Sequence, residues 1–157
     1  MKSPNNKSLI EVFGVVAIIV SLLFLGYELK RANDIAEAEA TATVYLGAND
    51  FLVAVITDQN IRKILRKAFG DISESLTDDE QMQFTTTMSY VYNIHEVAWK
   101  FHQKGLISDE DMAVRFTELC RWITGSPVLA EDWAARRDTV LPGFYEDVSR
   151  ECKITDE

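Results

Sequence analysis

Hydrophobic residues gather in one uninterrupted run near the start of the chain. From Val12 to Tyr27 the sequence reads VFGVVAIIVSLLFLGY, with no charged residue. As a helix rising about 1.5 Å per residue this run spans about 24 Å, and apolar neighbours on both sides extend it toward the ~30 Å hydrocarbon core of a bilayer. We therefore predict a transmembrane helix over residues 9–29, preceded by a short tail over residues 1–8.

Two other interpretations of this run remain open. A secretory signal peptide would use Lys2 and Lys7 as its charged start, but it needs small residues at a cleavage site soon after Gly26. The first such pattern, AEA at residues 36–38, comes about ten residues too late for that role. A buried core helix would need a larger protein around it, because the run is apolar on every face.

The charges that flank the run do not assign a side of the membrane to the rest of the chain. Lys2 and Lys7 precede the span, while Lys30 and Arg31 follow it. Lysine and arginine set orientation by their excess on the cytoplasmic side, and here the two sides tie. We leave the side of the following domain open.

Three small residues share one face of the predicted span. Gly14, Ala17 and Ser21 are three and four positions apart, which places them on the same side of a helix. Small residues allow a second helix to approach closely within a membrane, although they are also common in spans that make no such contact.

Beyond residue 30 the apolar positions recur at helical spacing, and no segment alternates apolar and polar residues as a strand does. We predict an all-α fold in which residues 30–152 form a bundle of four or five helices and residues 153–157 form a polar tail. Residues 47–50 (GAND) are a possible break in the first of these helices. The predicted helices cover residues 32–56, 60–69, 77–104, 109–124, 127 to the turn at 142–143, and 144–152.

Local signals mark where several of these helices begin and end. Thr77 followed by Glu80 is a capping box at a helix start, and Gly105 suits the left-handed residue after a helix end. Ser108 is a predicted N-cap, and Pro127 stands at a first-turn position.

The helix predicted over residues 77–104 is apolar nearly all round, as expected of a central bundle helix. Its two histidines, His95 and His102, are the only ones in the chain. Seven positions separate them by about 10.5 Å along the axis, too far for one metal ion, and no H-E-x-x-H motif occurs. We expect each to make a single hydrogen bond, and the alternative is a ligand pocket that also uses Tyr92 and Trp99.

Four basic residues gather on one short helix, namely Arg62, Lys63, Arg66 and Lys67. They could bind lipid headgroups or an acidic partner. The simpler interpretation is a solvated surface near a helix C-terminus, where cations are favoured.

Charge and cysteine content narrow the class of function. From Ala32 onward the chain carries 12 basic and 23 acidic residues, a net of −11, which disfavours binding to nucleic acid. No phosphate-binding glycine loop, nucleophile motif or zinc spacing occurs, so we predict no cofactor, no metal and no catalytic residue. Cys120 is expected to be a small buried apolar residue and Cys152 to lie in the polar tail. A pair between these two cysteines is possible, and by itself it says little about the redox compartment.

Three stretches carry a resemblance to a known group of proteins. They are VVAIIVSLLFLGYELKRAND over the span and its exit, residues 92–110 in the central helix and its turn, and residues 125–144 with their GSP and PGF turns. Together they resemble a family of short bacterial proteins with one N-terminal transmembrane helix, an all-helical domain and no established function. The resemblance implies a single-pass protein of the bacterial inner membrane.

These observations favour an interaction protein over an enzyme. The expected function is a membrane-anchored helical module that binds a protein partner or itself, for example as an accessory subunit of a membrane complex. Membrane lipid would surround the span. The alternative is a membrane-tethered enzyme or small-ligand sensor with its pocket near His95 and His102.

Overall fold

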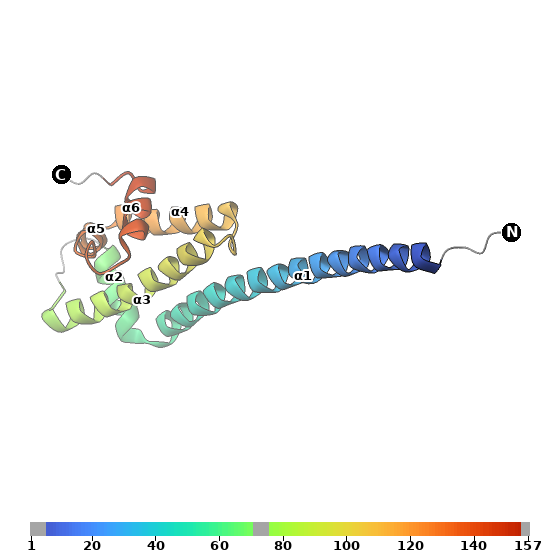
Figure 1. Cartoon of the computed structure of the whole chain (residues 1–157). Helices are drawn as coiled ribbons and strands as arrows, with labels where there is room; N and C mark the ends of the chain where they lie inside the picture. Colours follow the sequence, from blue (N-terminus) through green and yellow to red (C-terminus); the bar gives the residue numbers. More distant parts are fainter. Residues whose placement is uncertain (1–5, 71–75, 155–157) are drawn as a thin grey trace. The chain divides into compact units, whose positions relative to one another are not determined.

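A computed structural model of the chain describes residues 6–70 and 76–154, which are helical and contain no strand (Figure 1). This confirms the predicted all-α class. The helices of these two ranges number six, so the count expected after the span was not exact. They are α1 (Asn6–Thr57), α2 (Gln59–Phe69), α3 (Asp78–Gln103), α4 (Asp109–Gly125), α5 (Pro127–Ala134) and α6 (Pro142–Glu151).

The chain divides into two compact units, Met1–Ala38 and Glu39–Glu157. Helix α1 belongs to both units, because it continues without a break from Asn6 to Thr57 and so crosses their boundary between Ala38 and Glu39. The second unit contains the last turns of α1 together with α2 to α6.

The first unit holds one helix that is long and apolar enough to cross a membrane. Its most apolar window of 18 residues has a mean hydropathy of 2.4 and buries none of its residues within the protein. The large apolar side chains from Ile10 to Leu29 are between 50% and 74% exposed. A core helix would instead cover much of this surface with other parts of the protein.

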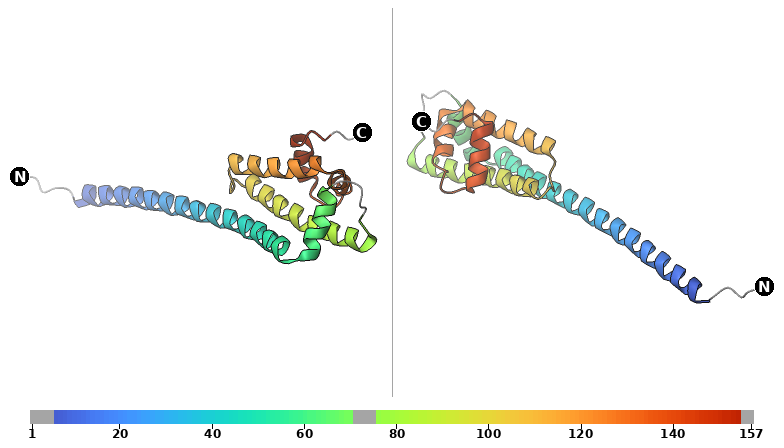
Figure 2. Two further views of the ribbon diagram at one scale, coloured as in Figure 1. Left: turned by 180° about the vertical axis from the view of Figure 1, so that it is seen from behind. Right: turned by 45° about the horizontal axis from the view of Figure 1, so that its top comes forward.

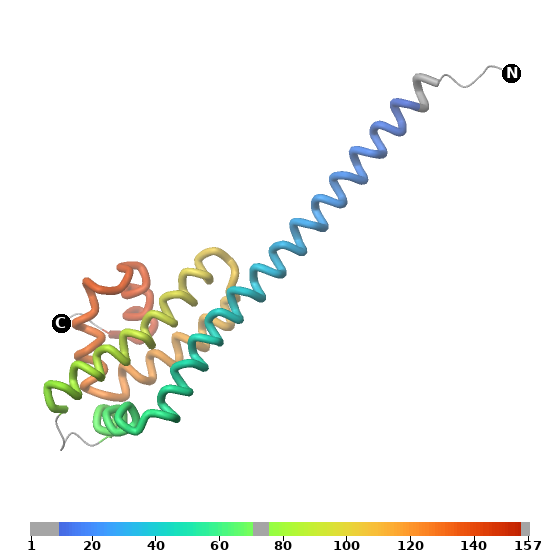
Figure 3. Tube along the Cα trace, turned by 90° about the horizontal axis from the view of Figure 1, so that it is seen from below, coloured from blue at the N-terminus to red at the C-terminus, as the bar shows by residue number. Residues whose placement is uncertain are grey.

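In the second unit, the last turns of α1 run beside α3 (Figure 3). The Tyr90 hydroxyl of α3 donates a hydrogen bond of 3.2 Å to the Gly47 carbonyl. A Cβ atom at Gly47 would lie 3.3 Å from the Ile94 side chain, so glycine permits the close approach. The possible break at residues 47–50 does not occur, because this segment continues the helix and packs against α3.

The predicted helix boundaries around α3 and α4 are confirmed. The Thr77 hydroxyl accepts from the Glu80 N–H at 3.3 Å, and the Glu80 carboxylate accepts from the Thr77 N–H at 3.0 Å. Gly105 has φ +70°, which glycine adopts without strain. The Ser108 hydroxyl caps α4 by accepting from the Asp111 N–H at 3.1 Å.

Helix α5 is shorter than predicted. It begins at Pro127 as expected but ends at Ala134, and turns rather than helix fill residues 135–139. Arg136 lies in these turns and reaches across to α3, where it donates to the Ser89 hydroxyl and the Thr85 carbonyl. The helix therefore ends next to a tertiary contact, where the local sequence gave no stop signal.

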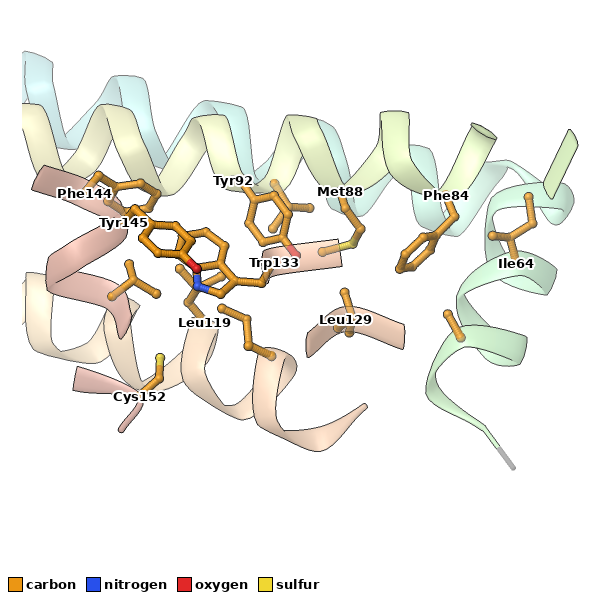
Figure 4. Packing of buried hydrophobic residues seen from close by; sticks show 14 residues of the cluster. Ile64, Phe84, Met88, Tyr92, Leu119, Leu129, Trp133, Phe144, Tyr145 and Cys152 are labelled. Atoms are coloured by element: carbon orange, nitrogen blue, oxygen red, sulfur yellow. The ribbon is translucent and has the colours of Figure 1, made fainter. Parts of the chain in front are cut away.

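Trp133 of α5 is the centre of the main hydrophobic core (Figure 4). Its side chain is fully buried. The ring stacks on Tyr145 at 5.0 Å between centroids and meets Tyr92 at 5.3 Å and Phe144 at 5.9 Å. Aromatic contacts of this geometry add stability beyond the area they bury.

The two cysteines are joined, which corrects the sequence-based expectation for both. Cys120 of α4 and Cys152, the residue after α6, form a disulfide bond. Helices α4 and α6 are in contact (Figure 2). Cys120 is therefore not a free apolar residue, and Cys152 belongs to the edge of the core rather than to a polar end. Thirty-two positions separate the two cysteines. Over such a distance, sequence alone does not show that two side chains meet.

Candidate interaction surface

An open groove of about 420 Å³ lies where the end of α1, α2 and α4 meet. Its walls are apolar apart from two arginines, Arg62 and Arg66. The apolar lining comes from three separate stretches of the chain: Phe51, Leu52, Val55, Leu65, Phe69 and Trp122.

Aromatic rings hold the floor of the groove together. The Trp122 ring lies 6.2 Å from Phe51 and meets Phe69 edge to face at 6.0 Å. Leu52 and Phe69 remain 53% and 43% exposed on the groove walls. Contiguous apolar surface that stays open to water on a folded domain is typical of an interaction site.

The four basic residues of α2 have different roles in the structure. Arg62 donates to the backbone carbonyls of Val55 and Ile56, and so satisfies acceptors left free at the end of α1. Lys67 and Lys63 both face Glu80 of α3, at 2.8 Å and 3.6 Å.

The ion pairs with Glu80 tie α2 to α3. The hydrogen bond from Lys67, together with that from the Thr77 N–H, lowers the pKa of Glu80 to about 2. Glu80 therefore stays ionised over the physiological pH range. Two of the four basic residues thus tie α2 to α3, whereas the sequence indicated only that the four are close together on one helix.

Arg66 is the exception among these four residues. It is exposed at the edge of the groove, and no residue within 6–70 or 76–154 pairs with it. An exposed guanidinium beside an apolar wall can bind a carboxylate. It therefore suits a partner that places apolar side chains in the groove and carries a carboxylate next to them.

The outer face of α1 in the second unit adds exposed apolar surface next to the groove. Val44 points into the bundle and is buried, while Leu46, Val53 and Ile56 point away from it and are exposed. Ile56 lies one helical turn beyond Leu52, so this face and the groove wall are neighbours.

Gly14, Ala17 and Ser21 lie in α1 as predicted and share one face. No side chain of the described protein covers this face, and a Cβ atom at Gly14 would meet nothing within 4 Å. The Ser21 hydroxyl donates to the Ala17 carbonyl at 2.8 Å, so its polar group is satisfied within the helix. A helix contact at this face stays a prediction.

His95 lines a cavity of about 90 Å³ between α1, α3 and α4. The imidazole is only 5% exposed, and its Nδ1 has no hydrogen-bond partner among the described residues, contrary to the hydrogen bond expected from the sequence. Burial, and then the nearby charge of Arg115, lower the pKa of His95 to about 4, so the ring is neutral at pH 7. A cavity of this size is smaller than the ~300 Å³ or more typical of organic ligands.

The other residues of the predicted pocket lie elsewhere. His102 Nε2 contacts the exposed Asp109 carboxylate at 2.9 Å. Tyr92 packs in the core against Trp133, and burial followed by the charge of Asp132 raises its pKa. The Trp99 indole donates to Asp147 at 2.8 Å. Of the four side chains, the cavity is lined by His95 alone.

A pair of opposite charges lies inside the bundle. Asp132 is buried and pairs with Arg136, whose guanidinium also lies 5.2 Å from the centre of the Tyr92 ring. No local sequence signal indicates that Asp132 is buried. Each group has a partner, so the cluster explains how α5 is fixed to α3.

Comparison with known proteins does not identify a relative. No family model matches the sequence, and neither a curated protein nor a solved structure is significantly similar. The resemblance drawn from the three sequence stretches stays a prediction. Across residues 6–70 and 76–154, no three side chains of the types that bind metals come together.

Proposed function

We propose that this protein is a single-pass membrane protein whose helical domain binds a protein partner, as an accessory subunit of a membrane complex in the bacterial inner membrane. The anchor is α1 within residues 9–29. Its apolar side chains are exposed on every face, and such a surface is more stable in lipid than in water.

The observation that supports binding is the open apolar groove of α1, α2 and α4 with the exposed Arg66 at its edge. We expect the partner to present aliphatic side chains to Phe69 and Trp122 and a carboxylate to Arg66. Charge complementarity favours this occupant, because a guanidinium beside an apolar wall matches an acidic amphipathic helix. The alternative occupant of the groove is a second copy of this chain, and the experiment below distinguishes the two.

Site-specific crosslinking tests the groove in the intact protein. A photoreactive residue replaces Phe69 in the groove, and Val114, which is exposed on α4 but outside the groove, serves as the matched control position. After detergent extraction from the native membrane, position 69 should crosslink to one defined protein and position 114 should not.

Binding of that protein is then measured with purified components. Arg66→Glu should weaken binding about tenfold, equal to about 1.4 kcal/mol, while Lys104→Glu, which makes the same charge change at an exposed position outside the groove, should leave it unchanged. A strictly monomeric protein without a crosslink at position 69, or equal effects of the two variants, would refute the proposed binding role. A crosslinked dimer of the chain would replace the heteromeric partner by a second copy.

A further inference from the structure

The disulfide bond bears on which side of the membrane the second unit lies, a question that the charges flanking the span leave open. Cys120 and Cys152 are the only cysteines of the chain, and the structure pairs them with each other. They come from α4 and from the residue that follows α6, so the bond connects two helices that pack together in the second unit.

The bond belongs to the folded core rather than to a loose surface segment. Cys152 is 9% exposed and is part of the main hydrophobic cluster, while Cys120 packs against that cluster. Val148, one helical turn before Cys152, and Leu119, directly before Cys120 in the sequence, are fully buried in the same cluster. Folding of the domain therefore brings the two thiols together and holds them there.

Whether two adjacent thiols become a disulfide depends on the compartment. Glutathione and thioredoxin keep thiols reduced in the cytosol, whereas disulfides form and persist in the periplasm, the endoplasmic reticulum lumen and outside the cell. Formation removes two electrons and two protons from the thiol pair, and an oxidising compartment supplies the thiol–disulfide oxidant that accepts them.

We propose that the unit Glu39–Glu157 lies on the oxidising, non-cytosolic side of the membrane, with the N-terminal tail in the cytosol. This inference rests on the anchor in the proposed function but not on the groove. Two basic residues precede the span and two follow it, so charge leaves the orientation open and the disulfide decides it.

The orientation restricts the partner as well. A groove on the oxidising side is accessible to exported proteins and to the outward-facing parts of membrane complexes. Cytosolic proteins cannot reach it. In a bacterial inner membrane, the partner is then periplasmic or has a periplasmic domain.

Thiol trapping in intact cells tests the redox state. Cells that express the full chain are treated with a permeant maleimide, the protein is denatured, and the remaining cysteines are labelled with a maleimide polymer that shifts the gel band. Without reduction, we expect no thiol to react with either maleimide, so the gel band does not shift. When the protein is reduced before the second labelling, we expect two polymers to be attached to each chain. Cys120→Ser calibrates the assay, because its single remaining thiol must react without reduction.

Paired reporters at the C-terminus test the side of the membrane independently. Alkaline phosphatase is active only after export, and green fluorescent protein exported through the general secretory route does not fluoresce. We expect an active phosphatase fusion and a dark fluorescent fusion. A fluorescent, membrane-bound fusion, or two free thiols in untreated cells, overturns the proposed orientation.

Membrane extraction separates this outcome from a failure of the proposed anchor. Full-length chain in the aqueous fraction after alkaline extraction would remove the anchor, whatever the redox state of the cysteines. Chain that stays in the membrane but carries free thiols would leave the anchor intact and refute only the orientation.

Discussion

The two halves of α1 present apolar side chains to different surroundings. In the first unit the side chains of the span are exposed all round, so no part of the described protein competes with lipid for them. In the second unit one face of the helix, including Val44, is buried against α3 and only the opposite face remains exposed. One continuous helix therefore combines an apolar segment without tertiary packing, the proposed span, with a segment that packs against α3.

The largest effect is expected where packing alone supplies the stability. Trp133→Ala should lower the free energy of unfolding of the second unit by about 3–5 kcal/mol, because a fully buried ring that contacts three other aromatic side chains is lost. Thermal unfolding of the detergent-solubilised protein measures this change, and membrane extraction should show that the span still inserts. Loss of membrane association together with folding would contradict the separation of the two halves.

Removing the disulfide should have the next largest effect. For a loop closed over 32 positions, the chain-entropy estimate for the double variant Cys120→Ser, Cys152→Ser is about 3–4 kcal/mol of lost stability. The unfolding midpoint in urea measures it, with and without reductant. Reductant should lower the midpoint of the natural chain toward that of the double variant, and should leave the double variant unchanged. A natural chain that is insensitive to reductant would mean that the bond does not stabilise the domain.

The same substitution in each half of α1 tests the comparison directly. Ile19 and Val53 are exposed to similar extents, 51% and 57%, but we place Ile19 in lipid and Val53 in water. Ile19→Lys should disfavour insertion by about 3 kcal/mol, because an ammonium group would lie within the hydrocarbon. Val53→Lys should change stability by less than ~0.5 kcal/mol. Insertion is read from the membrane-bound fraction, and equal results for both variants would mean that the span is not in lipid.

The smallest expected effect is the pH dependence from His95. Burial holds its folded pKa near 4, below the ordinary value of 6.5, so the unfolded chain binds more protons between these values and stability falls as the pH falls. Between pH 7 and pH 5 the loss is about 2 kcal/mol. His95→Leu should flatten this part of the stability curve, measured by urea unfolding at each pH.

His102→Gln is the control for that measurement, because it removes the half-exposed histidine and leaves the buried one in place. If His102→Gln flattened the curve and His95→Leu did not, the assignment of the pH dependence to the buried ring would be wrong.

Features that depend on neighbours along the chain could be predicted from the sequence. Length and apolar composition are enough to identify a candidate membrane span, and the run over residues 9–29 has both. Thr77 with Glu80, Ser108 and Gly105 specify helix ends through hydrogen bonds and backbone conformations within a few residues. The predicted helix ends are confirmed because their physical causes are local, and the run over residues 9–29 is confirmed as a candidate span.

Features that join distant segments depend on the tertiary structure. The groove draws Phe51, Phe69 and Trp122 from three helices, and the disulfide joins positions 120 and 152. Arg66 and Lys67 are adjacent in sequence, but only the fold gives Lys67 an ion pair with Glu80 and leaves Arg66 exposed at the groove. Helical periodicity places residues on a face of their own helix, and the path of the chain in space determines what that face meets.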